Sequence, residues 1–247
     1  DGAVCLDGTP GGFYISLAKN ASLKNSWQIY FMGGGWCYSK VDCLGRSKTN
    51  LGSSKKWPQQ FCAGGIMGAD EHTNPAFAHF NKVVMAYCDG NSFASDRSDP
   101  VPVTTTDSNG VSRSETIFWR GKRLMDAVLD TLVEKHGLGN AETVLLTGAS
   151  AGGLAAYLHT DYVHERIQTL APRMTKYRSA PISGFFLDHA NVLGSPVIET
   201  MMKNLFVESN ATGGVNRHCI AATAADDRWK CNFAAGSYAH TQAPIFA

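Results

Sequence analysis

The chain has 247 residues, of which 44% are hydrophobic and 17% are charged, and its net charge at pH 7 is +1. This length is enough for one large domain with a buried core, so we expect residues 1–247 to form a single domain. A charge this close to zero provides no field for gathering nucleic acid. No run of 18 apolar residues occurs, so the sequence predicts no membrane span.

Short β-rich runs alternate with longer helical patterns, which is typical of an α/β fold with a mostly parallel sheet flanked by helices. The first strands are predicted at 13–15 and 27–32, joined by a polar Lys, Asn and Ser stretch with hairpin character. Residues 83–87 are continuously apolar, which favours a third strand buried on both faces.

A polar segment and a helix follow. Residues 99–115 are rich in Thr, Ser, Pro and Asp, so we expect a surface loop or excursion here and not a linker between domains. Apolar residues at i, i+3, i+4 and i+7, from Met125 to Leu132, then predict an amphipathic helix. Gly137 is placed to end it.

A buried strand at 143–147 runs directly into Gly148-Ala149-Ser150-Ala151-Gly152-Gly153, and a helix is predicted from 154 to about 170. G-x-S-x-G between a strand and a helix is typical of a nucleophile elbow, a sharp turn that presents a serine at the carboxyl edge of a sheet. The alternative is that these small residues only make a tight turn. The strand–turn–helix context favours Ser150 as a nucleophile.

A second glycine-rich motif follows the strand at 27–32, where Gly33, Gly34 and Gly35 precede Trp36. In serine hydrolases of this kind, such a loop donates a backbone N–H to the negative oxygen that forms during the reaction. The residue after the nucleophile, Ala151, is expected to donate the other N–H. A phosphate-binding loop is the alternative, but the surrounding sequence lacks the spacing of the known nucleotide-binding motifs.

The remaining elements are predicted as a strand at 182–187, a helix at 196–207 and the opening of an apolar strand at 243–247. Because a domain rarely ends inside a core strand, we expect the chain to be part of something longer.

The acid and base partners of Ser150 should follow it in the chain, in the order Asp or Glu and then His. His159 and His164 are predicted on the helix after the elbow and should point away from the serine. Asp188 and His189 are adjacent, so both cannot reach one hydroxyl in series, and His240 precedes the last strand instead of following it. No pair after Ser150 satisfies both order and placement; the carboxylates considered were Asp161, Asp188, Asp226 and Asp227.

Seven cysteines are spread along the chain and none forms a CxxC pair, so a zinc or dithiol redox site is not indicated. Their spacing favours disulfides and an oxidising compartment over reduced core thiols, the alternative. Two glycosylation sequons, at Asn20 and Asn210, are compatible with a secreted protein.

The chain resembles the pectin acetylesterase family, which includes plant enzymes and the animal Wnt deacylase Notum, and the resemblance runs from end to end. The motifs that carry it are Cys5-Leu6-Asp7-Gly8-Thr9-Pro10, Gly33-Gly34-Gly35-Trp36-Cys37, Leu51-Gly52-Ser53-Ser54-Lys55, Tyr87-Cys88-Asp89-Gly90, Trp119-Arg120-Gly121, Ser150-Ala151-Gly152-Gly153 and Gly184-Phe185-Phe186-Leu187. One departure is Ala149, where plant members typically carry Cys.

The resemblance implies a secreted serine esterase with an α/β-hydrolase core, truncated at its C-terminus in this chain. It implies Ser150 as nucleophile, Trp36 and Ala151 as oxyanion donors and Gly35 in the same loop. The catalytic Asp and His would lie beyond residue 247, so the chain alone is expected to be inactive. It also implies three disulfides and leaves Cys62 over; the implied pairs are Cys5–Cys88, Cys37–Cys43 and Cys219–Cys231.

The expected reaction is O-deacetylation of a pectin-like polysaccharide through a Ser150 acyl-enzyme, with no metal and no cofactor. The alternatives are a Notum-like lipid deacylase that acts on an acylated protein, and a catalytically inactive secreted binding protein on the same scaffold. We expect a monomer whose partner is the acetylated polysaccharide or acylated protein substrate, without nucleic acid.

Overall fold

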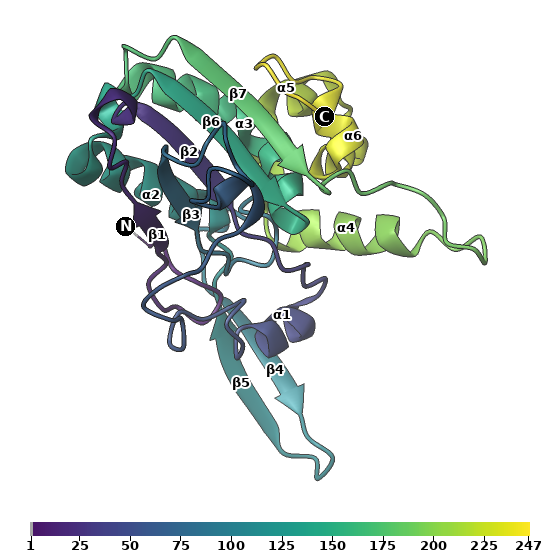
Figure 1. The fold of residues 1–247 in the computed structure, drawn as a ribbon. Helices are drawn as coiled ribbons and strands as arrows, with labels where there is room; N and C mark the ends of the chain where they lie inside the picture. Colours follow the sequence, from purple (N-terminus) through teal and green to yellow (C-terminus); the bar gives the residue numbers. More distant parts are fainter. Residues whose placement is uncertain (1) are drawn as a thin grey trace.

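The structure, a computed structural model, describes residues 2–247 and contains a five-stranded sheet with the order β1-β3-β2-β6-β7 (Figure 1). Its strands are β1 (Phe13–Ser16), β2 (Ser26–Phe31), β3 (Asn81–Met85), β6 (Thr143–Ala149) and β7 (Lys176–Ile182). Strands β3, β2, β6 and β7 are parallel, and only β1, at the edge, is antiparallel to its neighbour. The predicted α/β architecture with a mostly parallel sheet is confirmed.

The predicted hairpin between the first two strands is wrong, because β3 lies between β1 and β2. Every residue of β3 is buried, so this strand requires a neighbour on both sides. All four residues of β1 are partly or fully exposed, which suits an edge position.

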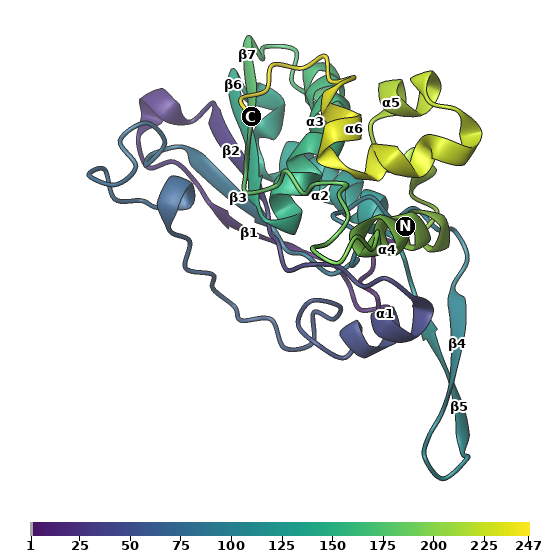
Figure 2. The same ribbon diagram turned by 90° about the vertical axis from the view of Figure 1, so that its right-hand side faces the viewer.

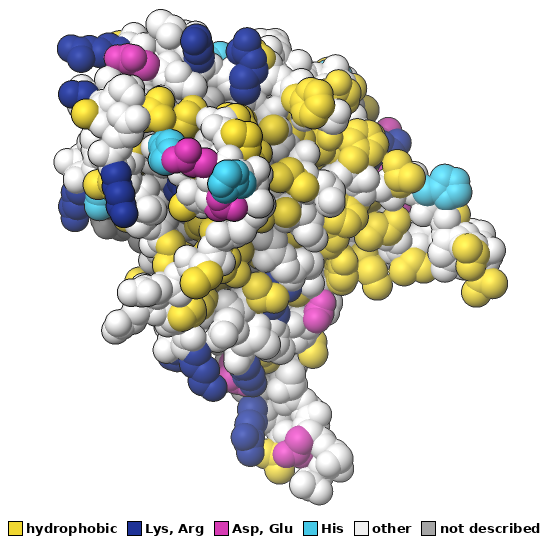
Figure 3. Space-filling model, viewed as in Figure 1, with side chains coloured by type: hydrophobic (Ala, Val, Ile, Leu, Met, Phe, Trp, Pro, Cys, Tyr) yellow, Lys and Arg dark blue, Asp and Glu magenta, His cyan; other side chains and the backbone are white. Residues whose placement is uncertain are grey.

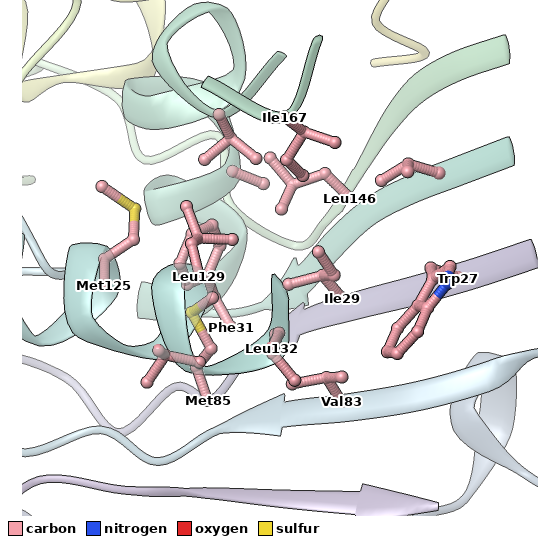
Figure 4. Close-up of a cluster of buried hydrophobic side chains, with 14 of the residues drawn as sticks. Trp27, Ile29, Phe31, Val83, Met85, Met125, Leu129, Leu132, Leu146 and Ile167 are labelled. Atoms are coloured by element: carbon pink, nitrogen blue, oxygen red, sulfur yellow. The ribbon is translucent and has the colours of Figure 1, made fainter. Parts of the chain in front are cut away.

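The main core lies between the sheet and two long helices, α2 (Gly121–His136) and α3 (Ala151–Leu170), which pack on the same side of the sheet (Figure 2). Alternate residues of the strands meet the apolar face of α2, as the close-up in Figure 4 shows. The labelled members of this cluster are Trp27, Ile29, Phe31, Val83, Met85, Met125, Leu129, Leu132, Leu146 and Ile167. The apolar residues that were predicted at helical spacing between 125 and 132 are therefore the ones that α2 buries against the sheet.

The segment expected as a loop at 99–115 is an excursion that contains regular structure. Strands β4 (Val101–Thr106) and β5 (Ser112–Ile117) form an antiparallel hairpin that projects from the molecule (Figure 2). Val101 and Val103 are buried while Pro102 and Thr104 are exposed, and this alternation is the strand signal that the polar composition obscured. Helix α1 (Lys40–Arg46) packs at the base of the hairpin.

The strand predicted at 182–187 is displaced, since β7 ends at Ile182. Ser183 takes a left-handed conformation with φ 49°, which terminates the strand. The exposed Lys176 and Arg178 alternate with the buried Tyr177 and Ser179, a pattern that a search for continuous apolar runs overlooks.

The chain after β7 crosses an exposed loop into α4 (Val197–Glu208), α5 (Arg217–Ala222) and α6 (Ala234–Tyr238). The helix predicted at 196–207 corresponds to α4. Single 3₁₀ turns lie at Ala21–Leu23, Gly65–Met67, Leu138–Asn140 and Ala211–Gly213, and a longer one lies at Ala225–Asn232. Among the helices of residues 2–247, none combines the length and apolar composition needed to cross a bilayer.

The last residues of the chain lie beside β7. Ile245 forms a parallel bridge with Ser179, whose N–H donates to Pro244 O at 2.9 Å and whose carbonyl accepts from Phe246 N–H at 2.8 Å. The buried carboxylate of Asp161 accepts the N–H groups of Gln242 and Ala243 at the start of this segment. The predicted strand at 243–247 is thus present as a short parallel pairing.

Candidate active site

The register of two neighbouring strands brings the two glycine motifs together. Strands β2 and β6 are parallel, and Phe31 pairs with Gly148. Gly33 follows Phe31 by two residues and Ser150 follows Gly148 by two residues, so both leave the sheet at the same carboxyl edge. This edge is where open α/β sheets place their ligand sites.

Ser150 has the backbone geometry of a nucleophile elbow. Its φ and ψ are 58° and −124°, a strained conformation for a residue other than glycine, and its side chain is exposed. Its N–H donates to Ile182 O at 3.0 Å, so the end of β7 holds the turn from one side. Helix α3 begins at Ala151, three residues earlier than predicted, which places Ser150 at the positive end of the helix dipole.

The glycine loop is in direct backbone contact with the elbow. A Cβ at Gly33 would lie 2.3 Å from Ala149 O and 3.3 Å from Ala151 N, and a Cβ at Gly152 would lie 2.0 Å from Phe31 O. Only glycine permits this approach at either position. The two motifs therefore form one structure, although 114 residues of sequence separate Trp36 from Ser150.

The carbonyl groups of the glycine loop point toward a buried side of the molecule. Arg46 donates to Gly34 O at 2.9 Å and, at 3.4 Å, to Gly35 O. The hydroxyl of Tyr87 also donates to Gly35 O, at 2.8 Å. Burial raises the pKa of Tyr87, so this hydroxyl keeps its proton and remains a donor.

Among the described residues, the backbone N–H of Ala151, which follows Ser150 directly, donates to no other backbone group, and neither do the N–H groups of Gly34, Gly35 and Trp36 in the glycine loop. The indole ring of Trp36 packs edge-on against Phe186, with ring centroids 4.7 Å apart, and its Nε1–H donates to Ser92 Oγ. The Ser92 hydroxyl in turn donates to Ala151 O at 2.8 Å. An exposed hydroxyl can attack a carbonyl, and unpaired amide donors near it can stabilise the resulting oxyanion.

Within residues 2–247, no histidine hydrogen-bonds to Ser150. His159 is buried and contacts Ser92 O through Nε2 at 2.9 Å; burial lowers its pKa to about 4, so it is neutral. His164 stacks on Tyr177, and the exposed His189 contacts the carbonyl of its own neighbour. That the catalytic base is none of these residues stays a prediction.

The carboxylates after Ser150 have other roles as well. Asp161 is buried and accepts hydrogen bonds from Asn216 Nδ2 and from two backbone N–H groups near the end of the chain. Asp188 is exposed in the loop that follows β7. Asp227 pairs with Lys230 at the surface.

Two residues that organise the site, Arg46 and Ser92, were not singled out from the sequence, and Tyr87 was named only as part of a family motif. Arg46 follows a short cysteine loop, and this position is the only sequence signal that could have indicated it. Ser92 carries no such signal, because its left-handed backbone and its partners 56 and 59 residues away emerge only from the fold.

Three disulfides are formed, and they are the same three pairs that the resemblance implies: Cys5–Cys88, Cys37–Cys43 and Cys219–Cys231. The second of these closes a short loop that connects the residue after Trp36 to α1, which carries Arg46. Cys62 is free and exposed.

Comparison with known proteins finds relatives that match nearly the whole chain. The family model described as Pectinacetylesterase matches residues 1–247. Pectin acetylesterase 5 of Arabidopsis thaliana is 31% identical over 245 residues, which are 99% of this chain and 53% of that protein. The palmitoleoyl-protein carboxylesterase NOTUM of Mus musculus is 29% identical over 254 residues, which cover 98% of this chain and 46% of that protein.

The fold is also that of a solved structure. The Wnt deacylase Notum from Drosophila superimposes with a TM-score of 0.83 at 23% identity, covering 99% of this chain and 67% of that chain. The chain spans about half the length of the curated relatives it matches.

Proposed function

Because this chain belongs to the pectinacetylesterase family, we propose that it supplies the nucleophile and the oxyanion hole of a serine-dependent carboxylic ester hydrolase. The observation that carries the proposal is the exposed Ser150 in its strained turn, directly before Ala151 at the start of α3 and in backbone contact with the loop that leads from Gly33 to Trp36. Gly35 lies in the same loop as Trp36, directly before the proposed Trp36 N–H donor.

The proposed reaction has two steps. The Ser150 hydroxyl gives its proton to a histidine base as its Oγ bonds to the ester carbonyl, and the N–H groups of Trp36 and Ala151 hold the oxyanion. The carbonyl re-forms, the C–O bond to the alcohol breaks, and the base returns its proton to the leaving alkoxide. Water then attacks the acyl-enzyme in the same way and releases the acid and Ser150.

We place the acid and base outside residues 1–247. The segment around Ile245 runs parallel to β7 and toward the carboxyl edge at which Ile182 accepts the Ser150 N–H. A residue that follows such a strand would emerge beside the elbow. This direction of the chain supports an Asp after residue 247 and a His further on, in the order expected for the class.

The proposed substrate is an acetyl ester of a pectin-like polysaccharide. Relatives named pectin acetylesterases are 28–34% identical to this chain, and those named palmitoleoyl-protein carboxylesterases are 24–29% identical, so the higher values belong to the first group. The higher identities among the acetylesterases are the observation that favours this substrate.

One observation favours the second candidate, deacylation of a lipid-modified protein. Apolar side chains are exposed in and beside the loop that follows β7, at the right of Figure 3. The most exposed of these are Leu187, Val192 and Leu193. A long acyl chain could lie on this surface, so the two substrates must be compared directly.

The test uses the full-length product of the gene and follows release of p-nitrophenol from p-nitrophenyl acetate. Ser150→Ala should lower kcat by at least ~10³-fold, and Ser195→Ala, a control at an exposed loop serine, should not. Equal rates for the wild type and Ser150→Ala would exclude the nucleophile. Release of acetate from acetylated pectin, compared with release of palmitoleate from an acylated peptide, decides the substrate.

The three disulfides support folding in an oxidising compartment, and we propose that the protein is secreted and acts as a monomer. Size-exclusion chromatography with light scattering would test the second statement.

A further inference from the structure

Ser92 connects the two sides of the candidate oxyanion hole. It follows β3, is fully buried and takes the left-handed conformation with φ 49°, which is uncommon for a residue other than glycine. A buried serine in a strained conformation is retained only where its surroundings determine it. All of its polar groups are hydrogen-bonded within the site.

The hydroxyl of Ser92 bridges the two elements that carry the proposed donors. A hydroxyl has one proton to donate, and Ala151 O can only accept, so Ser92 Oγ donates to Ala151 O at 2.8 Å. The same oxygen then accepts Nε1–H of Trp36, also at 2.8 Å. One atom thus fixes the indole of Trp36 relative to the first turn of α3.

The backbone of Ser92 fixes the same loop from a second direction. Its N–H donates to the hydroxyl oxygen of Tyr87 at 3.0 Å, and that hydroxyl donates to Gly35 O at 2.8 Å. Its carbonyl accepts from His159, which must carry its proton on Nε2 because a carbonyl cannot donate. The residues before and after the Gly35–Trp36 peptide bond are therefore both tied to Ser92.

We propose that Ser92 is a positioning residue that sets the separation between the Trp36 and Ala151 amides, and with it the fit of the hole to the oxyanion. This inference rests on the proposed esterase function. Amide donors stabilise an oxyanion when they lie about 2.7–3.1 Å from it, and a displacement of about 1 Å can cost on the order of 10²-fold in rate. Ser92 itself touches neither substrate nor nucleophile.

The experiment measures kcat and KM for p-nitrophenyl acetate in the full-length product, together with the Ki of 1,1,1-trifluoroacetone. This ketone adds to a serine nucleophile and forms an oxyanion like that of the reaction. Ser92→Ala should lower kcat by about 10- to 100-fold and leave KM within about twofold. The Ki should rise by the same factor by which kcat/KM falls, because both depend on the oxyanion.

Two further variants separate positioning from folding. Ser92→Gly removes the hydroxyl but tolerates the left-handed backbone, so it should lose activity as Ser92→Ala does with a smaller loss of thermal stability. Ser237→Ala is the matched control, since Ser237 is a buried serine that donates to a carbonyl, Cys231 O at 2.8 Å, within the C-terminal helices. Its kcat should equal that of the wild type.

The outcomes distinguish this inference from the proposed function. An inactive wild type, or one matched by Ser150→Ala, overturns the function and the inference together. An active wild type whose kcat and Ki are unchanged in both Ser92 variants overturns the inference alone. Should both variants fail to fold, Tyr87→Phe decides, because it removes the second tie on Gly35 and unchanged kinetics there would refute the network.

Discussion

Protonation of His159 should make the protein's stability depend on pH. His159 is buried beside Phe31 and donates to Ser92 O, and burial lowers its pKa from an ordinary 6.5 to about 4. In the unfolded chain the His159 imidazole binds a proton below about pH 6.5, whereas in the folded chain it binds one only below about pH 4. The contribution of neutral His159 to the free energy of unfolding is therefore fully present above pH 6.5 and is lost as the pH falls toward 4.

The size of the effect follows from the difference between the two pKa values. At about 1.4 kcal/mol per unit, the full loss is about 3 kcal/mol, and about 2 kcal/mol of it should appear between about pH 7.5 and about pH 5. His159→Gln keeps an N–H donor of similar reach and cannot be protonated in this range. The free energy of unfolding should then fall less steeply with acidification in the variant than in the wild type.

Urea unfolding at the two pH values, followed by tryptophan fluorescence with the disulfides kept oxidised, provides the measurement. His72→Gln, at an exposed histidine, is the control and should retain the pH dependence of the wild type. If wild type and His159→Gln lose the same free energy between the two pH values, the assignment of a buried neutral imidazole is refuted.

Two further changes test the packing of the elbow and of the last segment. Gly152→Ala should destabilise the protein by about 1–3 kcal/mol in urea unfolding, because the new Cβ would lie 2.0 Å from Phe31 O; Gly45→Ala, with open space around its Cβ, should not destabilise. Asp161→Ala should cost about 3 kcal/mol and speed amide hydrogen exchange at Ala243, since two backbone N–H groups lose their charged acceptor; unchanged exchange there would contradict the anchoring role.

The elbow could be predicted from the sequence because its determinants are local. A strand, a bend of small residues and a helix follow one another within 143–170, and the serine at the bend can take few other positions. The sheet edge at which Gly33 meets Ser150 follows from parallel pairing of the two strands that precede them. Each of these inferences needs only the alternation of strands and helices.

Other features depend on which strands become neighbours. The hairpin predicted between β1 and β2 failed because β3, 50 residues after β2, pairs with both. A strand that is buried on both faces is stable only in the interior of a sheet. This requirement outweighs the preference of the polar connection between β1 and β2 for a tight turn. The end of β7 was likewise set by Ser183 and by the close approach of Gly184 to Gly153, which no local pattern encodes.

The same division applies within the site. The nucleophile motif and the strand register bring Ser150 and the Gly33–Trp36 loop to one edge of the sheet. They do not determine the exact position of the loop, because a run of glycines is flexible. The distance between two amides has to be held to a fraction of an ångström for the chemistry proposed here. That accuracy comes from side chains outside the two glycine motifs, since Arg46 and Tyr87 hold the loop carbonyls and Ser92 links Trp36 to Ala151. A sequence motif can therefore identify the reacting groups of such a hydrolase, while their alignment depends on long-range contacts that only the folded chain reveals.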